Sequence, residues 1–152
     1  MAVTSRSAIK VDGLRELQVA LKRFAPAVEV AFRADIAAVA KVVADDARTT
    51  VPVYPEMTGK PRHHPGAAQR SIKVVQSPNW VSIKGGGART KWYPWLDFGG
   101  TLHPTGGRKN SITRERLKKG RFIYPAIDRN QAKIRAGALA AVKHAKRMAG
   151  FY

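Results

Sequence analysis

Apolar residues near the start of the chain recur at intervals of three and four, which is typical of an α-helix with one buried face. The members of this stripe are Leu14, Leu17, Leu21, Phe24 and Val28. Pro26 falls inside the pattern, where a continuous helix would lose a backbone donor. We therefore expect a break near Ala25 and a second helix with Pro26 in its first turn. Asp12 is the expected N-cap of the first helix.

The second helix is predicted over residues 26–49. Its apolar face contains Phe32, Ile36, Val39 and Val43, and seven alanines between residues 31 and 47 leave room for a sheet or another helix to approach closely. Pro52 ends it, because the residue before a proline is pushed out of the helical region. Charged residues interrupt this alanine-rich stretch, so we expect no membrane-spanning segment and no membrane partner.

Two segments are predicted to lack regular structure before the sheet begins. Residues 1–10 are polar and are expected to be flexible. Residues 53–69 are rich in proline and glycine and predict a long loop. Long loops within a small domain are often functional, so this segment is a candidate docking element.

The middle of the chain has the shorter, alternating runs of β-strands. Residues 70–76 and 80–84 are predicted as two strands joined by a tight turn. The glycines at 85–87 are expected to close a hairpin onto a third strand at 90–98. Pro94 within that run indicates an edge position or a bulge.

The C-terminal third returns to helical spacing. Residues 101–120 form a second predicted long loop, in which 111–119 could make one or two helical turns. Residues 121–124 are a short fourth strand or extended piece, and 125–148 are a last helix. This order predicts one α+β domain over residues 1–152, with the N-terminal helices and the C-terminal helix packed on a small antiparallel sheet of three to four strands.

An aromatic cluster stands out within the predicted third strand. It comprises Trp92, Tyr93, Trp95 and Phe98. Such clusters are more often part of a core than of a site. However, consecutive strand residues face opposite sides of a sheet, so one core cannot bury all of them. We therefore predict these four residues as a subunit or ring interface, and oligomerisation through it.

Charge is the strongest compositional signal. The chain has 28 basic and 10 acidic residues, a net charge of +18, and residues 101–152 hold thirteen basic and two acidic ones. This asymmetry indicates a polyanion or an acidic protein as partner; the alternative is charge that serves solubility. The predicted DNA-channel or acidic-partner contacts are Arg108, Lys109, Arg114, Arg116, Lys118, Lys119 and Arg121. Against nucleic acid they would bind phosphates without reading sequence.

The sequence offers little chemistry for catalysis. There is no cysteine, which excludes a disulfide framework and a thiolate metal site and is typical of a protein made in a reducing cytosol. His63 and His64 are adjacent and point apart, and His103 stands alone, so no metal site is predicted. The glycines at 85–87 join two predicted strands, whereas a phosphate loop joins a strand to a helix. We expect no cofactor and no enzyme activity.

Five short motifs, spread over nearly the whole chain, resemble those of a phage protein family. They are Gly-Leu-x-x-Leu at 13–17, Ala-x-x-x-x-Pro-Val at 47–53, Thr-Gly at 58–59 followed by Ser-Ile at 71–72, a Tyr-to-Gly-Thr segment at 93–101 with one extra glycine, and Phe-x-x-Pro-Ala at 122–126. In this order they resemble the neck or tail-completion (head–tail joining) proteins of long-tailed bacteriophages, the lambdoid putative tail-component family.

The resemblance implies a structural virion protein at the head–tail junction, assembled in the host cytoplasm. It implies a homo-oligomeric ring, a hexamer, that encloses the DNA channel. Its partners would be a head-completion or stopper protein on one side and a tail terminator or tail tube protein on the other, with non-specific contact to the DNA backbone. The competing hypothesis from composition is a sequence-independent, basic nucleic-acid-binding protein.

Overall fold

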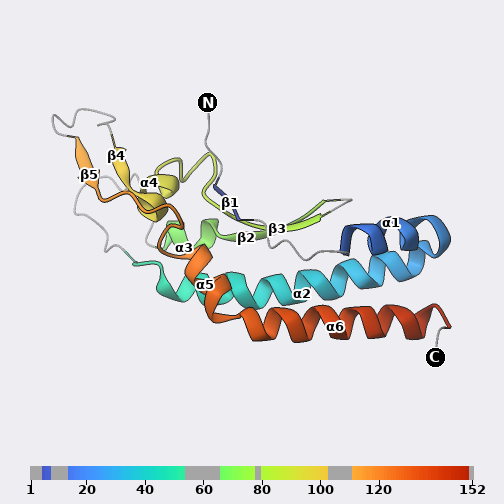
Figure 1. Ribbon diagram of the computed structural model, residues 1–152. Helices are drawn as coiled ribbons and strands as arrows, with labels where there is room; N and C mark the ends of the chain where they lie inside the picture. Colours follow the sequence, from blue (N-terminus) through green and yellow to red (C-terminus); the bar gives the residue numbers. More distant parts are fainter. Residues whose placement is uncertain (1–4, 8–13, 54–65, 78–79, 103–110, 151–152) are drawn as a thin grey trace.

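The computed structural model describes residues 5–7, 14–53, 66–77, 80–102 and 111–150, and it has the α+β architecture expected from the sequence (Figure 1). Its elements are β1 (Ser5–Ser7), α1 (Leu14–Phe24), α2 (Pro26–Thr50), α3 (Ala67–Ser71), β2 (Lys73–Ser77), β3 (Trp80–Gly85), α4 (Tyr93–Phe98), β4 (Gly100–Leu102), β5 (Ile112–Arg114), α5 (Ile123–Arg129) and α6 (Gln131–Met148).

The break between the first two helices is confirmed. Helix α1 ends at Phe24, and α2 begins at Pro26. The missing N–H of this proline costs nothing in the first helical turn, where no acceptor precedes it. At the other end, Val51 has extended dihedrals (φ −76°, ψ 125°) before Pro52, so α2 stops where the sequence predicts. The proposed N-cap, Asp12, lies outside the described residues.

Helix α2 is the central element. It packs against the sheet and, along another side, against α6, which runs in the opposite direction (Figure 1). The close approach to α6 depends on Gly137, because a Cβ atom there would lie 2.3 Å from Val39 Cγ2. Within the described part of the chain, no helix is long and apolar enough to cross a membrane.

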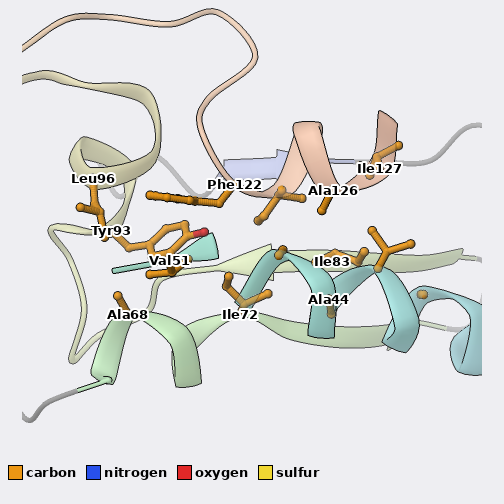
Figure 2. Packing of buried hydrophobic residues seen from close by; sticks show 14 of the residues in the cluster. Ala44, Val51, Ala68, Ile72, Ile83, Tyr93, Leu96, Phe122, Ala126 and Ile127 are labelled. Atoms are coloured by element: carbon orange, nitrogen blue, oxygen red, sulfur yellow. The ribbon is translucent and has the colours of Figure 1, made fainter. Parts of the chain in front are cut away.

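The main core lies between α2, α4, α5 and one face of the sheet. Figure 2 shows Ile83 of the sheet between Ala44 and Ile127, with Tyr93 and Phe122 towards the opposite end of the cluster. A second, smaller cluster joins the far end of α2 to α1 and α6. Its buried members are Val28, Phe32, Ala141 and Ala145.

The main sheet has three antiparallel strands in the order β1-β3-β2, with Val74 and Ser7 both opposite Ile83. The expectation of a flexible N-terminus is wrong for residues 5–7, which form an edge strand. Their side chains carry no strand pattern. The strand exists because β3 offers backbone groups along its free edge, and this is not visible in the local sequence.

The predicted third strand is wrong, because residues 93–98 form helix α4. Pro94 occupies the first turn of this helix, where proline is as well tolerated as on an edge strand. Leu96 N bonds Trp92 O at 3.1 Å, and Gly99 N bonds Trp95 O at 2.8 Å. Three positions of α4 with helical spacing are buried: Tyr93, Leu96 and Asp97.

Other predicted element boundaries also differ from those in the structure. Residues 67–71 form α3, so the loop predicted over 53–69 ends earlier and β2 begins at Lys73; residues 54–65 lie outside the described part. In the segment predicted as a loop, β4 and β5 pair as a two-stranded antiparallel sheet. Residues 123–124 begin α5 instead of extending as a strand.

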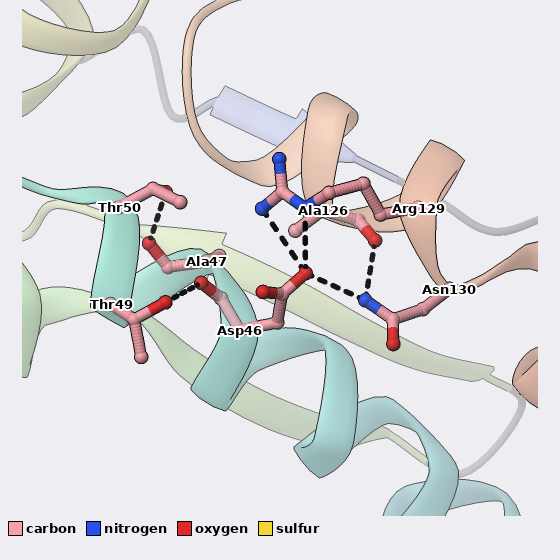
Figure 3. A network of polar contacts seen from close by, with 7 residues as sticks. All are labelled: Asp46, Ala47, Thr49, Thr50, Ala126, Arg129 and Asn130. Atoms are coloured by element: carbon pink, nitrogen blue, oxygen red, sulfur yellow. Dashed lines mark hydrogen bonds and ion pairs between the residues drawn. The ribbon is translucent and has the colours of Figure 1, made fainter.

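The single predicted C-terminal helix is two helices, separated at Asn130. Asn130 Nδ2 donates to Asp46 Oδ2 at 2.7 Å and to Ala126 O at 2.9 Å, while Arg129 also contacts Asp46 (Figure 3). This polar cluster joins the end of α5 to the C-terminal half of α2, at the point where α6 begins.

We expect Gly137→Ala to destabilise the protein by about 1–2 kcal/mol, because overpacking against Val39 outweighs the gain of about 1 kcal/mol in helix propensity. Chemical denaturation measures this change. As a control, Val39→Ala combined with Gly137→Ala should recover most of the loss. A stabilised single variant would contradict the close contact between α2 and α6.

Candidate functional site

The aromatic residues predicted as an interface separate into two groups. Tyr93 is fully buried and belongs to the core of the chain itself, so it is not available to a neighbouring subunit. Trp92 and Trp95 are partly buried and pack against the same core. Phe98 is half-buried and meets Tyr124 edge to face, with ring centroids 6.4 Å apart. Burial excludes Tyr93 from an interface, and for Trp92, Trp95 and Phe98 the interface stays a prediction.

The structure brings part of the basic segment directly onto these aromatic residues. The Arg114 guanidinium lies 5.8 Å from the centroid of the Trp95 ring and donates to Leu96 O at 3.0 Å. Arg121 donates to Asp97 O at 3.1 Å and to Glu115 O at 2.7 Å. Two arginines predicted to contact DNA or an acidic partner thus bind the C-terminal end of α4.

The other predicted basic contacts differ in their placement. Arg116, Lys118 and Lys119 are exposed. Lys119 Nζ lies 3.9 Å from Asp128 Oδ2, a solvent-exposed pair that contributes little to stability. Arg108 and Lys109 lie outside the described residues. Three of the seven predicted side chains are therefore presented to solvent in the part that the structure describes.

A buried carboxylate organises this region. Asp97 is completely buried, and its Oδ1 accepts hydrogen bonds from Arg121 N at 2.7 Å and Phe122 N at 3.1 Å. Burial raises the pKa of Asp97, and the two backbone N–H groups and the Arg121 charge oppose that shift. Burial and the nearby Asp97 charge also raise the pKa of Tyr93. Both side chains are closed to solvent, so no substrate reaches them.

Glycines make this arrangement sterically feasible. Gly99 has φ +82°, and a Cβ atom there would lie 1.8 Å from Glu115 O. Gly120 has φ +69°, and its Cβ would lie 2.5 Å from Asp97 Oδ1. The segment that leads from β5 to α5 therefore crosses the end of α4 in direct backbone contact. We call Asp97, Gly99, Arg114, Gly120 and Arg121 the α4 clasp.

The clasp has partial signals in the sequence. The glycine pair at 99–100 and the single Gly120 mark the two crossing points, and Asp97 is an isolated acid in a basic region. The pairing between them is not visible locally. The glycines at 85–87 also differ from expectation, because they lead from β3 towards helix α4 instead of a third strand. Gly85 packs against the Tyr93 ring: a Cβ atom added at Gly85 would lie 2.1 Å from Tyr93 Cε1.

No metal centre emerges from the residues that the structure describes, where no group of three or more potential ligands converges. His63, His64 and His103 fall outside those residues. His144 Nδ1 lies 2.6 Å from Asp35 Oδ2 and joins α6 to α2, which is a structural contact.

A further surface, not recognised from the sequence, runs along α2. Val30, Ala34, Ala38 and Val42 follow one another at intervals of four on its exposed side, with Val30 64% and Val42 46% exposed. We call these four residues the α2 stripe. The helical period was visible in the sequence, but alanines and valines occur all around this helix, so only the packing distinguishes the exposed side.

Comparisons with known proteins gave no match: no family model fits the chain, and no curated protein or solved structure is significantly similar to it. Functional inference therefore depends on the residues and their geometry.

We expect Asp97→Ala to cost about 3 kcal/mol, because two buried N–H groups lose their acceptor. Asp97→Asn retains an acceptor oxygen and should cost much less. A raised native pKa means that the folded protein binds more protons than the unfolded chain above about pH 4, so stability falls as pH rises to the native pKa. Urea denaturation across this range should show wild type losing stability relative to Asp97→Asn. A constant difference would contradict the raised pKa.

Gly99→Ala and Gly100→Ala form a matched pair. Both glycines have positive φ, but an added Cβ at Gly100 meets nothing within 4 Å. Gly100→Ala should cost about 1–2 kcal/mol of backbone strain, and Gly99→Ala at least twice that because it also clashes with Glu115 O. Thermal unfolding of both variants tests the crossing. Equal losses would show that the two segments do not touch there.

Proposed function

We propose that this chain is a structural protein of the head–tail connector, or neck, of a long-tailed bacteriophage. In this role it forms a homo-oligomeric ring, a hexamer, that encloses the DNA channel and joins head-completion proteins to the tail tube. The observation that carries the proposal is the presence of two unlike surfaces on one molecule, the β4–β5 hairpin held by the α4 clasp and the α2 stripe. A closed ring needs two such patches, because its contacts run head to tail.

The first surface is the β4–β5 hairpin with α4 at its base. It lies at the end of the molecule opposite α1 (Figure 1). Ile112 is 44% exposed, and Arg116 and Lys118 beyond β5 are exposed as well. The α4 clasp holds the base of the hairpin through hydrogen bonds to buried backbone groups. Strands β4 and β5, held in this way, lose little conformational entropy when they dock on a neighbouring protein.

The second surface is the α2 stripe, for which we propose a second copy of this chain as the occupant. Two molecules that each carry a net charge of +18 repel one another. Contact between them is least opposed where the surface is apolar and uncharged. The four residues of the stripe are uncharged and extend over about three helical turns, with the exposed Lys41 beside them, whereas α6 exposes Lys133, Lys143 and Arg147.

Three of the five motifs that carry the family resemblance coincide with structural junctions in the described part of the chain. The motif at 47–53 ends α2, the motif at 93–101 comprises α4 and its turn into β4, and the motif at 122–126 opens α5. These positions support a structural role for the motifs, in which they set where helices begin and end. The proposed role requires no catalysis and no cofactor. A stopper protein and a tail terminator or tail tube protein are the proposed partners in the virion.

We expect native mass spectrometry and negative-stain images of the purified protein to show closed rings. Val42→Glu should raise the concentration needed for half-assembly at least tenfold, about 1.4 kcal/mol, because it places a charge in the contact. Val19→Glu on α1 is the matched control, since Val19 is 60% exposed and outside the stripe.

Circular dichroism and the thermal midpoint should be unchanged in both variants. A monomeric wild-type protein would contradict the ring, and equal weakening by both substitutions would contradict the role of the α2 stripe.

A further inference from the structure

The face of the main sheet that points away from α2 has a distinct composition. Ile83 is buried beneath α2, and Val74 and Val81 pack against the same core. Neighbouring strand residues face the opposite side. This alternation places Lys73, Val75, Trp80, Ser82 and Lys84 on the other side, which we call the outer sheet face.

Basic residues are aligned across the strands on this face. Lys73 of β2 stands directly opposite Lys84 of β3, and the backbone register places Arg6 of β1 opposite Lys84 on the other edge. None of the three strands contains an acidic residue. Like charges directly opposite one another destabilise a sheet. The row is therefore costly by itself, and an anion bound across it would remove that cost.

An aromatic ring lies beside the row. Lys84 Nζ is 5.3 Å from the centroid of the Trp80 ring, and Trp80 is 42% exposed. Ser82 lies between these residues on the same strand and is only 5% exposed. Lys84 thus lies over one face of the Trp80 ring, and the exposed part of the ring is at the edge of a positive surface.

We propose that the outer sheet face binds single-stranded nucleic acid. Lys73 and Lys84 bind backbone phosphates, and an unpaired base stacks on Trp80. Adjacent cations with an accessible aromatic ring are what sequence-tolerant single-strand binding requires. The bases of a duplex are already stacked, so a duplex can use only the lysines. The exposed cations of α6 have no aromatic residue among them in that helix and would bind either form weakly.

This inference does not depend on ring formation, because the outer sheet face is separate from the α2 stripe and from the α4 clasp. It gives a binding role to Lys73, Lys84 and Trp80, which lie outside the predicted basic segment at 108–121. The two proposals can therefore fail independently: loss of assembly in Val42→Glu and loss of binding in the sheet variants are measured on different faces.

The test is fluorescence anisotropy with a labelled oligothymidylate of about 20 nucleotides, compared with a duplex of the same length. Wild type should bind the single strand more tightly, with affinity that falls steeply as salt rises. Lys73→Glu with Lys84→Glu should weaken binding at least tenfold. Lys143→Glu with Arg147→Glu on α6, which makes the same change in charge, should have a clearly smaller effect.

Trp80→Leu separates stacking from charge. It should weaken single-strand binding about tenfold and leave duplex binding unchanged. If the double Glu variant does not keep its thermal midpoint, Lys73→Gln with Lys84→Gln provides the same comparison with a milder change. The inference is overturned if wild type does not bind the single strand, if the α6 control loses as much affinity, or if Trp80→Leu has no effect.

Discussion

Helix α2 packs on two sides, against the sheet and against α6, and the other helices and strands take their positions from it. Small residues allow this. Ala40, Ala44 and Ala47 are buried where the sheet approaches. On the side of α2 that faces α6, Gly137 leaves room for Val39. In the C-terminal half of α2, Arg48 donates to Ile72 O before β2, and Asp46 accepts from Asn130 at the end of α5. The hydrophobic core and the connections to later segments therefore meet on one helix.

The α4 clasp extends this order to the end of the molecule. Its contacts are mainly hydrogen bonds, from Arg114 and Arg121 to backbone carbonyls and from two backbone N–H groups to Asp97. Burial of the ionised Asp97 side chain costs free energy, and for this reason its pKa is raised. The hydrogen bonds from the backbone N–H groups of Arg121 and Phe122 offset that cost. Arg114 and Arg121 were identified from charge as candidate partner contacts. In the structure, both are hydrogen-bonded to carbonyl groups of the chain itself. A high density of basic residues therefore did not identify which ones face solvent.

The two proposals use different parts of this arrangement. Ring assembly as a phage connector would use the α2 stripe and the β4–β5 hairpin, and nucleic-acid binding would use the outer sheet face. In a ring, every copy repeats the same row of lysines, so weak contacts with a polyanion add up through multivalency. Positive charge that opposes self-association elsewhere on the surface would then serve the ring once a nucleic acid is enclosed.

The sequence by itself determined α1, α2, the break at Pro26 and strand β3, because periodicity and proline act over a few neighbouring residues. It also identified the aromatic and basic residues that form the candidate site, but not their contact. Only the tertiary structure decided that residues 93–98 are a helix, because Pro94 suits both an edge strand and a first helical turn, and burial of Tyr93, Leu96 and Asp97 favours the helix. The same holds for β1, which pairs through backbone groups, and for the break at Asn130, which depends on Asp46, 84 residues away in the chain.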